Sequence, residues 1–146
     1  MYPINLPKAN IKIREENEQT YIFDVIRKKY LVLTPEEWVR QHVVHLLINS
    51  YNYPKGLFRT EMGHTYNQLQ KRTDVLIYNA SGEVDVLVEC KAPEVTITQQ
   101  TITQAMQYNL VHKASTVIIT NGLQTFCFVL QNGKWVQEND FPSFKK

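Results

Sequence analysis

The pattern of hydrophobic and polar residues along the chain predicts a β-rich protein with two helices. Residues 1–19 contain two prolines and end in a polar stretch, which indicates an arm or an edge strand. In residues 20–34 β-branched and aromatic residues alternate with polar ones, a pattern typical of one or two strands with a turn near residues 27–29. We therefore expect residues 1–33 to form an N-terminal arm and β-hairpin.

The clearest predicted helix covers residues 34–50. Thr34 is placed to be its N-cap, Pro35 to be its first helical residue, and Glu37 to complete a capping box. The apolar residues of this segment recur at helical spacing and predict the inward face. These residues are Val39, Val43, Leu46 and Leu47.

Strand-like segments follow this helix. Residues 57–66 can form a strand and residues 67–71 a loop. Residues 72–91 contain two β-rich runs joined by "NASGE", in which Gly82 supplies a left-handed backbone position. The pattern predicts a β-hairpin here.

The last third of the chain predicts a second helix and the final strands. The helix lies within residues 96–114, where apolar residues recur at helical period: Ile102, Ala105, Met106 and Leu110. Residues 115–122 and 124–137 are predicted strands, the second folding back at Asn132-Gly133. The order helix, three strands, helix, strand predicts an α/β fold, with a mixed sheet of four to five strands flanked by helices.

Length and composition limit the alternatives. With 146 residues, 43% of them hydrophobic and 21% charged, the chain is expected to be one globular domain over residues 1–146, with residues 34–146 as its core. No apolar run reaches the ~20 residues of a membrane helix, and no secretion signal is evident, so we expect no membrane contact and a cytoplasmic location. Cys90 and Cys127 lie in strand-like runs without metal-site spacing, which predicts reduced core thiols.

The second strand of the predicted hairpin ends in an acid and a base. Strand alternation places Glu89 and Lys91 on one face and Cys90 on the other. Charges at the dry end of a strand need a partner, a metal or water, because burying an unpaired charge costs several kcal/mol. Antiparallel pairing brings Asp74 near residue 89 or 90, and two neighbouring carboxylates are stabilised by a cation.

The side chains at the end of this strand suggest which reaction the site could support. Carboxylates with open water positions suit Mg²⁺, for which Mn²⁺ can substitute, and both ions bind phosphate oxygens. Lys91 is placed to hold the attacking water and to offset charge on a phosphate. The set predicts metal-assisted phosphodiester hydrolysis, whereas the alternative is an ordinary ion pair between Glu89 and Lys91. On the second helix, Gln104 and Tyr108 are four residues apart and share one side.

The residues Asp74, Glu89-Cys90-Lys91, Gln104 and Tyr108 resemble the active-site signature of the PD-(D/E)XK nuclease superfamily. The stretches "TPEEWVRQH", "RTDVLIY", "VLVECKAP" and "VIITNG" are more narrowly similar to the N-terminal nuclease domain of type I restriction enzyme R subunits. The resemblance covers about residues 20–135 and departs at Thr73, where the superfamily has proline.

This resemblance implies a restriction-endonuclease-like core and roles for five residues. Asp74 and Glu89 would bind Mg²⁺, and Lys91 would assist the water nucleophile. Gln104 and Tyr108 would support the site or contact the nucleic acid.

Further candidates lie outside the signature. Family members often carry a further acid on the first helix, for which Glu37 is the nearer candidate metal ligand and Glu36 the other. Lys71 and Arg72 form a basic pair that is a candidate nucleic-acid contact. Type I R subunits also have an ATP-driven motor, but this chain has no G-x-x-x-x-G-K-[ST] loop, so we expect a nuclease-like module without the motor.

Two functions are therefore expected. The first is a Mg²⁺-dependent endonuclease or exonuclease acting on DNA, where cutting both strands would need a homodimer or two successive cuts. The second is a non-catalytic module that keeps the fold to bind nucleic acid or a protein. A third hypothesis makes His42, His45 or His64 a general base, and it is the least favoured because His42 and His45 have apolar neighbours on their helix.

Overall fold

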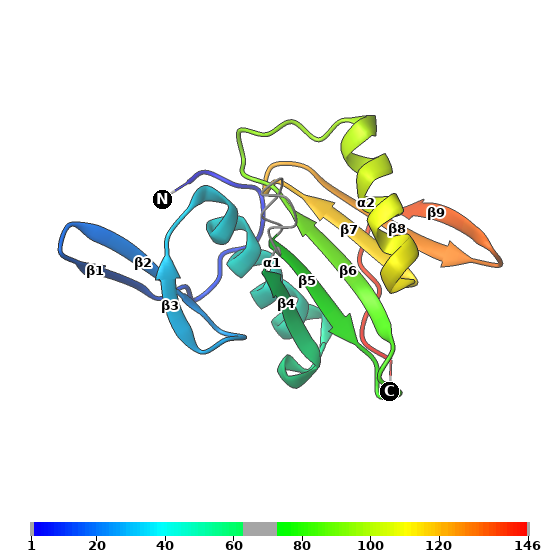
Figure 1. The fold of residues 1–146 in the computed structure, drawn as a ribbon, viewed down its shortest axis with the longest axis horizontal. Coiled ribbons are helices and arrows are strands. Elements are labelled where there is room, and N and C mark those ends of the chain that lie inside the picture. Colours follow the sequence, from blue (N-terminus) through cyan, green and yellow to red (C-terminus); the bar gives the residue numbers. More distant parts are fainter. Residues whose placement is uncertain (1, 63–72, 146) are drawn as a thin grey trace.

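The described part of the chain contains two α-helices, an antiparallel sheet and a mixed sheet (Figure 1). The computed structural model describes residues 2–62 and 73–145, with the backbone alone described for residues 61, 62, 73 and 74. Three strands in the order β1-β2-β3 form one sheet, and six strands in the order β4-β5-β6-β7-β8-β9 form the other. Figure 1 shows the smaller sheet at one end of the molecule and the larger sheet at the other.

The N-terminal sheet contains β1 (Ile13–Glu16), β2 (Gln19–Asp24) and β3 (Lys29–Val32). Both pairs are antiparallel, as in successive hairpins. The turn expected near residues 27–29 ends at Lys28, which has a left-handed φ of 58°. The predicted hairpin is thus confirmed as β2 and β3, and part of the predicted arm is a third strand.

Helix α1 (Pro35–Tyr51) begins as predicted. The Thr34 side chain caps it by accepting a hydrogen bond of 3.1 Å from the Glu37 N–H, and Asn52 ends it with a left-handed φ of 66°. The reciprocal half of the capping box is not formed, because the Glu37 carboxylate binds Arg40 instead.

The buried face of α1 is close to the predicted one. Val39, Val43 and Leu47 are buried, but Leu46 is only half-buried and Val44 is buried in its stead. Val39, Val43 and Leu47, each four residues apart, together with Val44 form the stripe that packs on the sheet.

The larger sheet follows the predicted order of elements. After a 3₁₀ turn (Lys55–Leu57), its strands are β4 (Phe58–Met62), β5 (Thr73–Tyr78), β6 (Val84–Cys90), β7 (Thr116–Thr120), β8 (Thr125–Gln131) and β9 (Lys134–Glu138). Helix α2 (Gln99–His112) connects β6 to β7, the one parallel pair in this sheet among the described residues.

The predicted count of four to five strands is wrong, because this sheet has six. Strand β9 adds the sixth by folding back on β8 at Asn132-Gly133, where both residues have positive φ, 52° and 78°. Such a two-residue turn matches the twist of a hairpin. The mixed α/β class and the order helix, three strands, helix, strand are confirmed.

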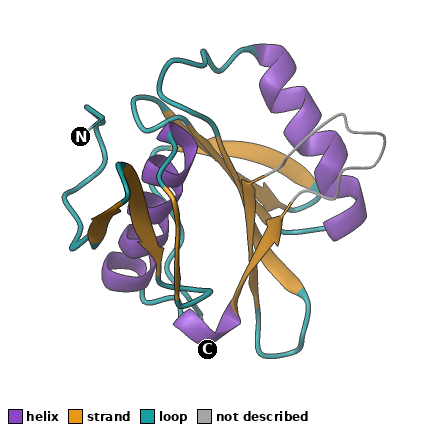
Figure 2. Ribbon diagram, turned by 60° about the vertical axis from the view of Figure 1, so that its left-hand side comes forward, coloured by secondary structure: helices purple, strands orange, loops and turns teal. Residues whose placement is uncertain are grey.

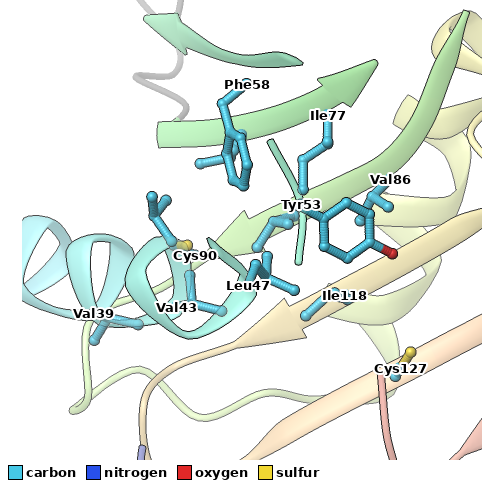
Figure 3. Close-up of a cluster of buried hydrophobic side chains, with 13 residues drawn as sticks. Val39, Val43, Leu47, Tyr53, Phe58, Ile77, Val86, Cys90, Ile118 and Cys127 are labelled. Carbon is cyan, nitrogen blue, oxygen red and sulfur yellow. The ribbon is translucent and has the colours of Figure 1, made fainter. Parts of the chain in front are cut away.

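The two helices cover opposite faces of the larger sheet (Figure 2). We call the two groups of buried side chains the α1-side and α2-side clusters. The α1-side cluster includes Val39, Val43, Leu47, Phe58, Val75, Ile77, Val86, Val88, Cys90 and Ile118. Figure 3 shows the α1 residues of this cluster beside those of the strands. The α2-side cluster includes Leu76, Leu87, Ile97, Ala105, Val117 and Ile119. Burial of each such aliphatic side chain larger than alanine contributes roughly 1.5–3 kcal/mol.

The buried face of α2 differs from the predicted face at one position. Ala105 is buried and Ile102 and Met106 pack partly against the α2-side cluster, as expected. Leu110 is instead 74% exposed, while Asn109 is buried. The Asn109 amide donates to the Ala114 carbonyl at 3.0 Å and its oxygen accepts the Ala114 N–H at 2.9 Å, so it ties the end of α2 to the approach to β7.

Both cysteines are buried free thiols, as predicted. Burial, followed by the nearby carboxylates of Glu138 and Asp140, raises the pKa of Cys127 to about 11, which keeps it protonated near neutrality. Neither helix in the described part of the chain is long and apolar enough to cross a membrane.

Candidate active site

The acid and the base at the end of β6 lie in contact. The Glu89 side chain is 5% exposed, and its Oε2 lies 3.4 Å from the Nζ of Lys91, whose side chain is 32% exposed. Along β6, Leu87 belongs to the α2-side cluster, whereas Val88 and Cys90 belong to the α1-side cluster. Strand alternation thus places Glu89 and Lys91 on the face covered by α2.

The pairing beyond the end of β6 fixes the backbone of Lys91. Its N–H donates a hydrogen bond of 2.8 Å to the carbonyl oxygen of Thr120 in β7, which continues the parallel pairing by one residue. The Lys91 ammonium group therefore extends from a backbone that is held by β7, and it lies at the border between core and solvent.

The register of β5 on β6 places the backbone of Asp74 beside that of Glu89. Val75 is the partner of Val88, so one further step along both strands reaches residues 74 and 89. This agrees with the predicted neighbourhood of Asp74. On the other side, Asp74 is the backbone partner of Glu61 in β4. Sequence reasoning missed Glu61, because strand pairing between β4 and β5 was not predicted in register.

The two predicted helix residues lie on α2, over the same face of the sheet. Gln104 is exposed, whereas Tyr108 is half-buried against the α2-side cluster and its ring lies 4.8 Å from that of His112. Of the remaining candidates, Lys71, Arg72 and His64 lie outside the described residues.

Glu37 occupies a different environment. It is 7% exposed and its Oε2 accepts a hydrogen bond of 3.1 Å from the Nε of Arg40. Arg40 also donates to the Oδ2 of Asp24 at 3.3 Å. This buried ion-pair network joins β2 to α1, so Glu37 is engaged by Arg40 on the α1 side of the sheet, whereas strand alternation places Glu89 on the α2 side. Glu36 is half-buried on the same helix.

The contacts of His42 on α1 indicate a structural role. Nδ1 of His42 donates to the Trp38 carbonyl oxygen at 2.7 Å, and its ring packs on that of Trp38. Burial lowers the pKa of His42, and also that of His45, where the charges of His42 and Lys55 act in the same direction. His42 therefore acts as a packed helix residue.

Asn121 is a positioning residue that sequence reasoning did not single out. It is 2% exposed, and its amide donates to the carbonyl oxygen of Val95 at 2.8 Å. Its side-chain oxygen accepts the N–H groups of Leu123 and Gln124 at 2.9 and 2.8 Å. The loop that follows Lys91 is thereby tied to the turn after β7. The Asn-Gly pair in "VIITNG" is the sequence signal for this turn.

The donor chemistry at the end of β6 fits a hard divalent cation. Mg²⁺ is commonly held by one or two carboxylates, with water and phosphate oxygens completing its shell. Glu89 supplies one carboxylate, and the register brings a second acidic residue, Asp74, to the adjacent position. Among the side chains that the structure describes, no three His, Cys, Asp or Glu residues converge on one point.

Comparison with known families places this chain beside restriction-enzyme sequences. The family described as type I restriction enzyme R protein N terminus matches residues 35–142. The matched region begins at the first residue of α1 and extends past β9, so it includes both helices and the whole larger sheet. Comparison with curated proteins finds no match.

Proposed function

Because the chain belongs to the family of type I restriction enzyme R protein N termini, we propose that it is a metal-dependent nuclease module that hydrolyses DNA phosphodiester bonds. The observation that carries this proposal is the buried Glu89 in contact with Lys91, with Asp74 in register beside it. The order of elements supports a restriction-endonuclease-like core of the PD-(D/E)XK type.

Each residue has a distinct role in this proposal. Glu89 and Asp74 would hold Mg²⁺, or Mn²⁺ in its place, which would supply a Lewis acid for charge on the phosphate. Lys91 orients the water nucleophile and neutralises a phosphate oxygen, since its ammonium group is partly exposed while Glu89 fixes its position. Gln104 and Tyr108 contribute an amide and a hydroxyl from α2 toward the DNA backbone.

Contacts outside the metal site complete the proposal. Lys71 and Arg72 precede β5 directly in sequence, so we assign them to the phosphates that flank the scissile bond. Glu37 is left out of the metal site, because its carboxylate is held by Arg40 on the other face of the sheet.

A binding module without catalysis is the second candidate. The Glu89–Lys91 ion pair favours it, since the pair alone offsets both charges at the end of β6. In this case the exposed part of Lys91 would contact a phosphate and no metal would be required.

Cleavage and metal binding together distinguish the two candidates. The purified chain is incubated with linear and circular DNA in Mg²⁺ or Mn²⁺, and Mn²⁺ affinity is measured by calorimetry. We expect Lys91→Ala to reduce cleavage by about 100-fold or more while retaining Mn²⁺ binding, because it removes charge stabilisation and no metal ligand. Glu89→Gln and Asp74→Asn should lose both cleavage and Mn²⁺ affinity.

Lys134→Ala is the matched control, because Lys134 is an exposed lysine on β9. It should leave cleavage unchanged, and thermal melting verifies that each variant is folded. Cleavage that survives Lys91→Ala and Asp74→Asn would refute the nuclease proposal. DNA binding without cleavage, together with no measurable Mn²⁺ affinity, would support the second candidate.

A further inference from the structure

A cavity of about 350 Å³ lies between the N-terminal sheet and α1. Its wall is built from four segments that are distant in sequence: the chain before β1, strand β2, the second half of α1, and the 3₁₀ turn that begins at Lys55. Its volume falls within the range of small-molecule sites. Since α1 and α2 cover opposite faces of the larger sheet, this cavity is separate from the Glu89 site.

The charged groups around the cavity have one sign. Lys12, His45 and Lys55 line it, and none of the described lining residues is acidic. The Lys12 ammonium lies 5.5 Å from the centre of the Phe23 ring, a cation–π contact that holds it at the wall. Burial lowers the pKa of His45, and the charges of His42 and Lys55 lower it further. An anion would be stabilised here by both ammonium groups and by proton uptake at His45.

The nearest buried acid does not cancel this charge. Asp24 follows Phe23 on β2, but its carboxylate is paired with Arg27 at 3.0 Å and with Arg40 at 3.3 Å. Those two guanidinium groups offset its negative charge. The net field in the cavity therefore remains positive.

The rest of the lining suits a planar organic group. Phe23 and Ile48 supply apolar surface, and Asn10 and Asn49 supply side-chain amides. Each amide offers one acceptor and a donor group, the combination that pairs with N6 and N7 of adenine. Cationic, apolar and amide groups thus meet in one cavity of nucleotide scale.

We propose that this cavity binds an adenine nucleotide, with its phosphate between Lys12 and Lys55 and its base against Phe23 and Ile48. The same chemistry is carried by a free mononucleotide and by the 5′-phosphorylated end of a DNA strand. The site goes beyond the proposed nuclease activity and requires no divalent metal.

Calorimetry on the whole chain tests this proposal, with a chelator present so that the Glu89 site cannot contribute. The probes are deoxyadenosine 5′-monophosphate, inorganic phosphate and a 5′-phosphorylated dinucleotide. We expect the mononucleotide to bind more tightly than inorganic phosphate, and Lys55→Gln to weaken binding by about tenfold, since a charge-assisted hydrogen bond is lost. The double variant Lys12→Gln/Lys55→Gln should weaken it further, whereas Lys134→Gln should have no effect.

NMR of the histidine rings gives a second measurement that does not depend on a variant. Adding the mononucleotide should shift the His45 resonances and raise the pKa of His45, while His112 on α2 stays unchanged. Tighter binding of the dinucleotide than of the mononucleotide would identify a DNA strand end as the ligand. Tighter binding of the mononucleotide would identify a free nucleotide as the ligand. Equal affinity for inorganic phosphate, no binding of the mononucleotide, or binding insensitive to both lysine substitutions would each overturn the proposal.

Discussion

Replacing Arg40 should be among the most destabilising single changes in this protein. Arg40 is 1% exposed and pairs with Glu37 and Asp24, which are themselves buried. Asp24 also accepts hydrogen bonds from the N–H groups of Ile26 and Arg27, at 2.9 and 3.3 Å. The network therefore connects the N-terminal sheet to α1, and Arg40 is the cation that its two carboxylates share.

The magnitude follows from what the substitution leaves behind. Arg40→Met keeps most of the side-chain volume but leaves two buried carboxylates, of which Asp24 keeps its ion pair with Arg27. Removing one partner of a buried ion pair costs about 3–5 kcal/mol. At a urea m-value of about 2 kcal/mol per molar, the unfolding midpoint should fall by roughly 2 M.

The pH dependence provides a check on the mechanism. Burial raises the pKa of Asp24, but the Arg40 charge and the Ile26 and Arg27 N–H groups outweigh it, so the pKa lies below its usual 3.8. Because the folded-state pKa is depressed, this stabilisation is complete above pH 3.8 and is lost as the pH falls through the folded value. The difference in stability between wild type and Arg40→Met should therefore narrow in acid.

Urea unfolding followed by circular dichroism, at neutral pH and in acid, measures both effects. Arg27→Gln is the control, because Arg27 is partly exposed and its loss leaves the Arg40 pairs intact; it should cost about 1 kcal/mol or less. A loss below about 1 kcal/mol for Arg40→Met at neutral pH, or a loss that does not depend on pH, would refute this account of the network.

Two further predictions concern a turn and a partly buried tyrosine. Gly122→Ala should lower the free energy of unfolding by about 3 kcal/mol, because φ is +86° and a Cβ would lie 2.6 Å from the Ile4 side chain. Gly82→Ala, with φ of +82° in open space, should lower it by about 1 kcal/mol. Urea unfolding compares the two variants, and equal losses of stability would contradict the steric cause. The hydrogen bond to Asp140, followed by burial, raises the pKa of Tyr51 to about 12. Asp140→Asn should therefore lower the pKa of Tyr51 in an NMR titration. An unchanged pKa would exclude this hydrogen bond as the cause of the shift.

The fold was predictable where local chemistry and periodicity agree. Thr34 and Pro35 mark the start of α1, and Asn132-Gly133 mark the last hairpin, because each residue type has a specific backbone preference. The number of strands in each sheet was less predictable. It depends on which strands pair, and pairing is determined by contacts between residues distant in sequence. Strands β1 and β9 are both mostly exposed, so their apolar periodicity carries little signal, and β9 was indicated by the turn residues Asn132-Gly133 alone.

The inward face of α2 shows why a pattern of apolar residues can mislead. Leu110 continues the helical period of Ile102 and Met106, yet it is exposed because Asn109 takes the inward position. Asn109 is buried at low cost, since both of its amide groups are bonded to Ala114. A buried polar residue whose partners lie in the next loop cannot be distinguished from a surface residue by periodicity alone.

Periodicity likewise cannot distinguish Glu89 from Glu37, whereas their partners in the structure do. Both are buried glutamates near the end of a secondary-structure element, and each has a basic partner within three residues. Glu37 pairs with Arg40, itself buried and shared with Asp24, so the charge is confined to the interior. Glu89 pairs with Lys91, about a third of which remains in solvent, and the β5–β6 register adds a second acid beside it. The first arrangement stabilises a fold, whereas the second leaves part of a cation in solvent beside a buried carboxylate, which is the physical basis for proposing the active site at the end of β6.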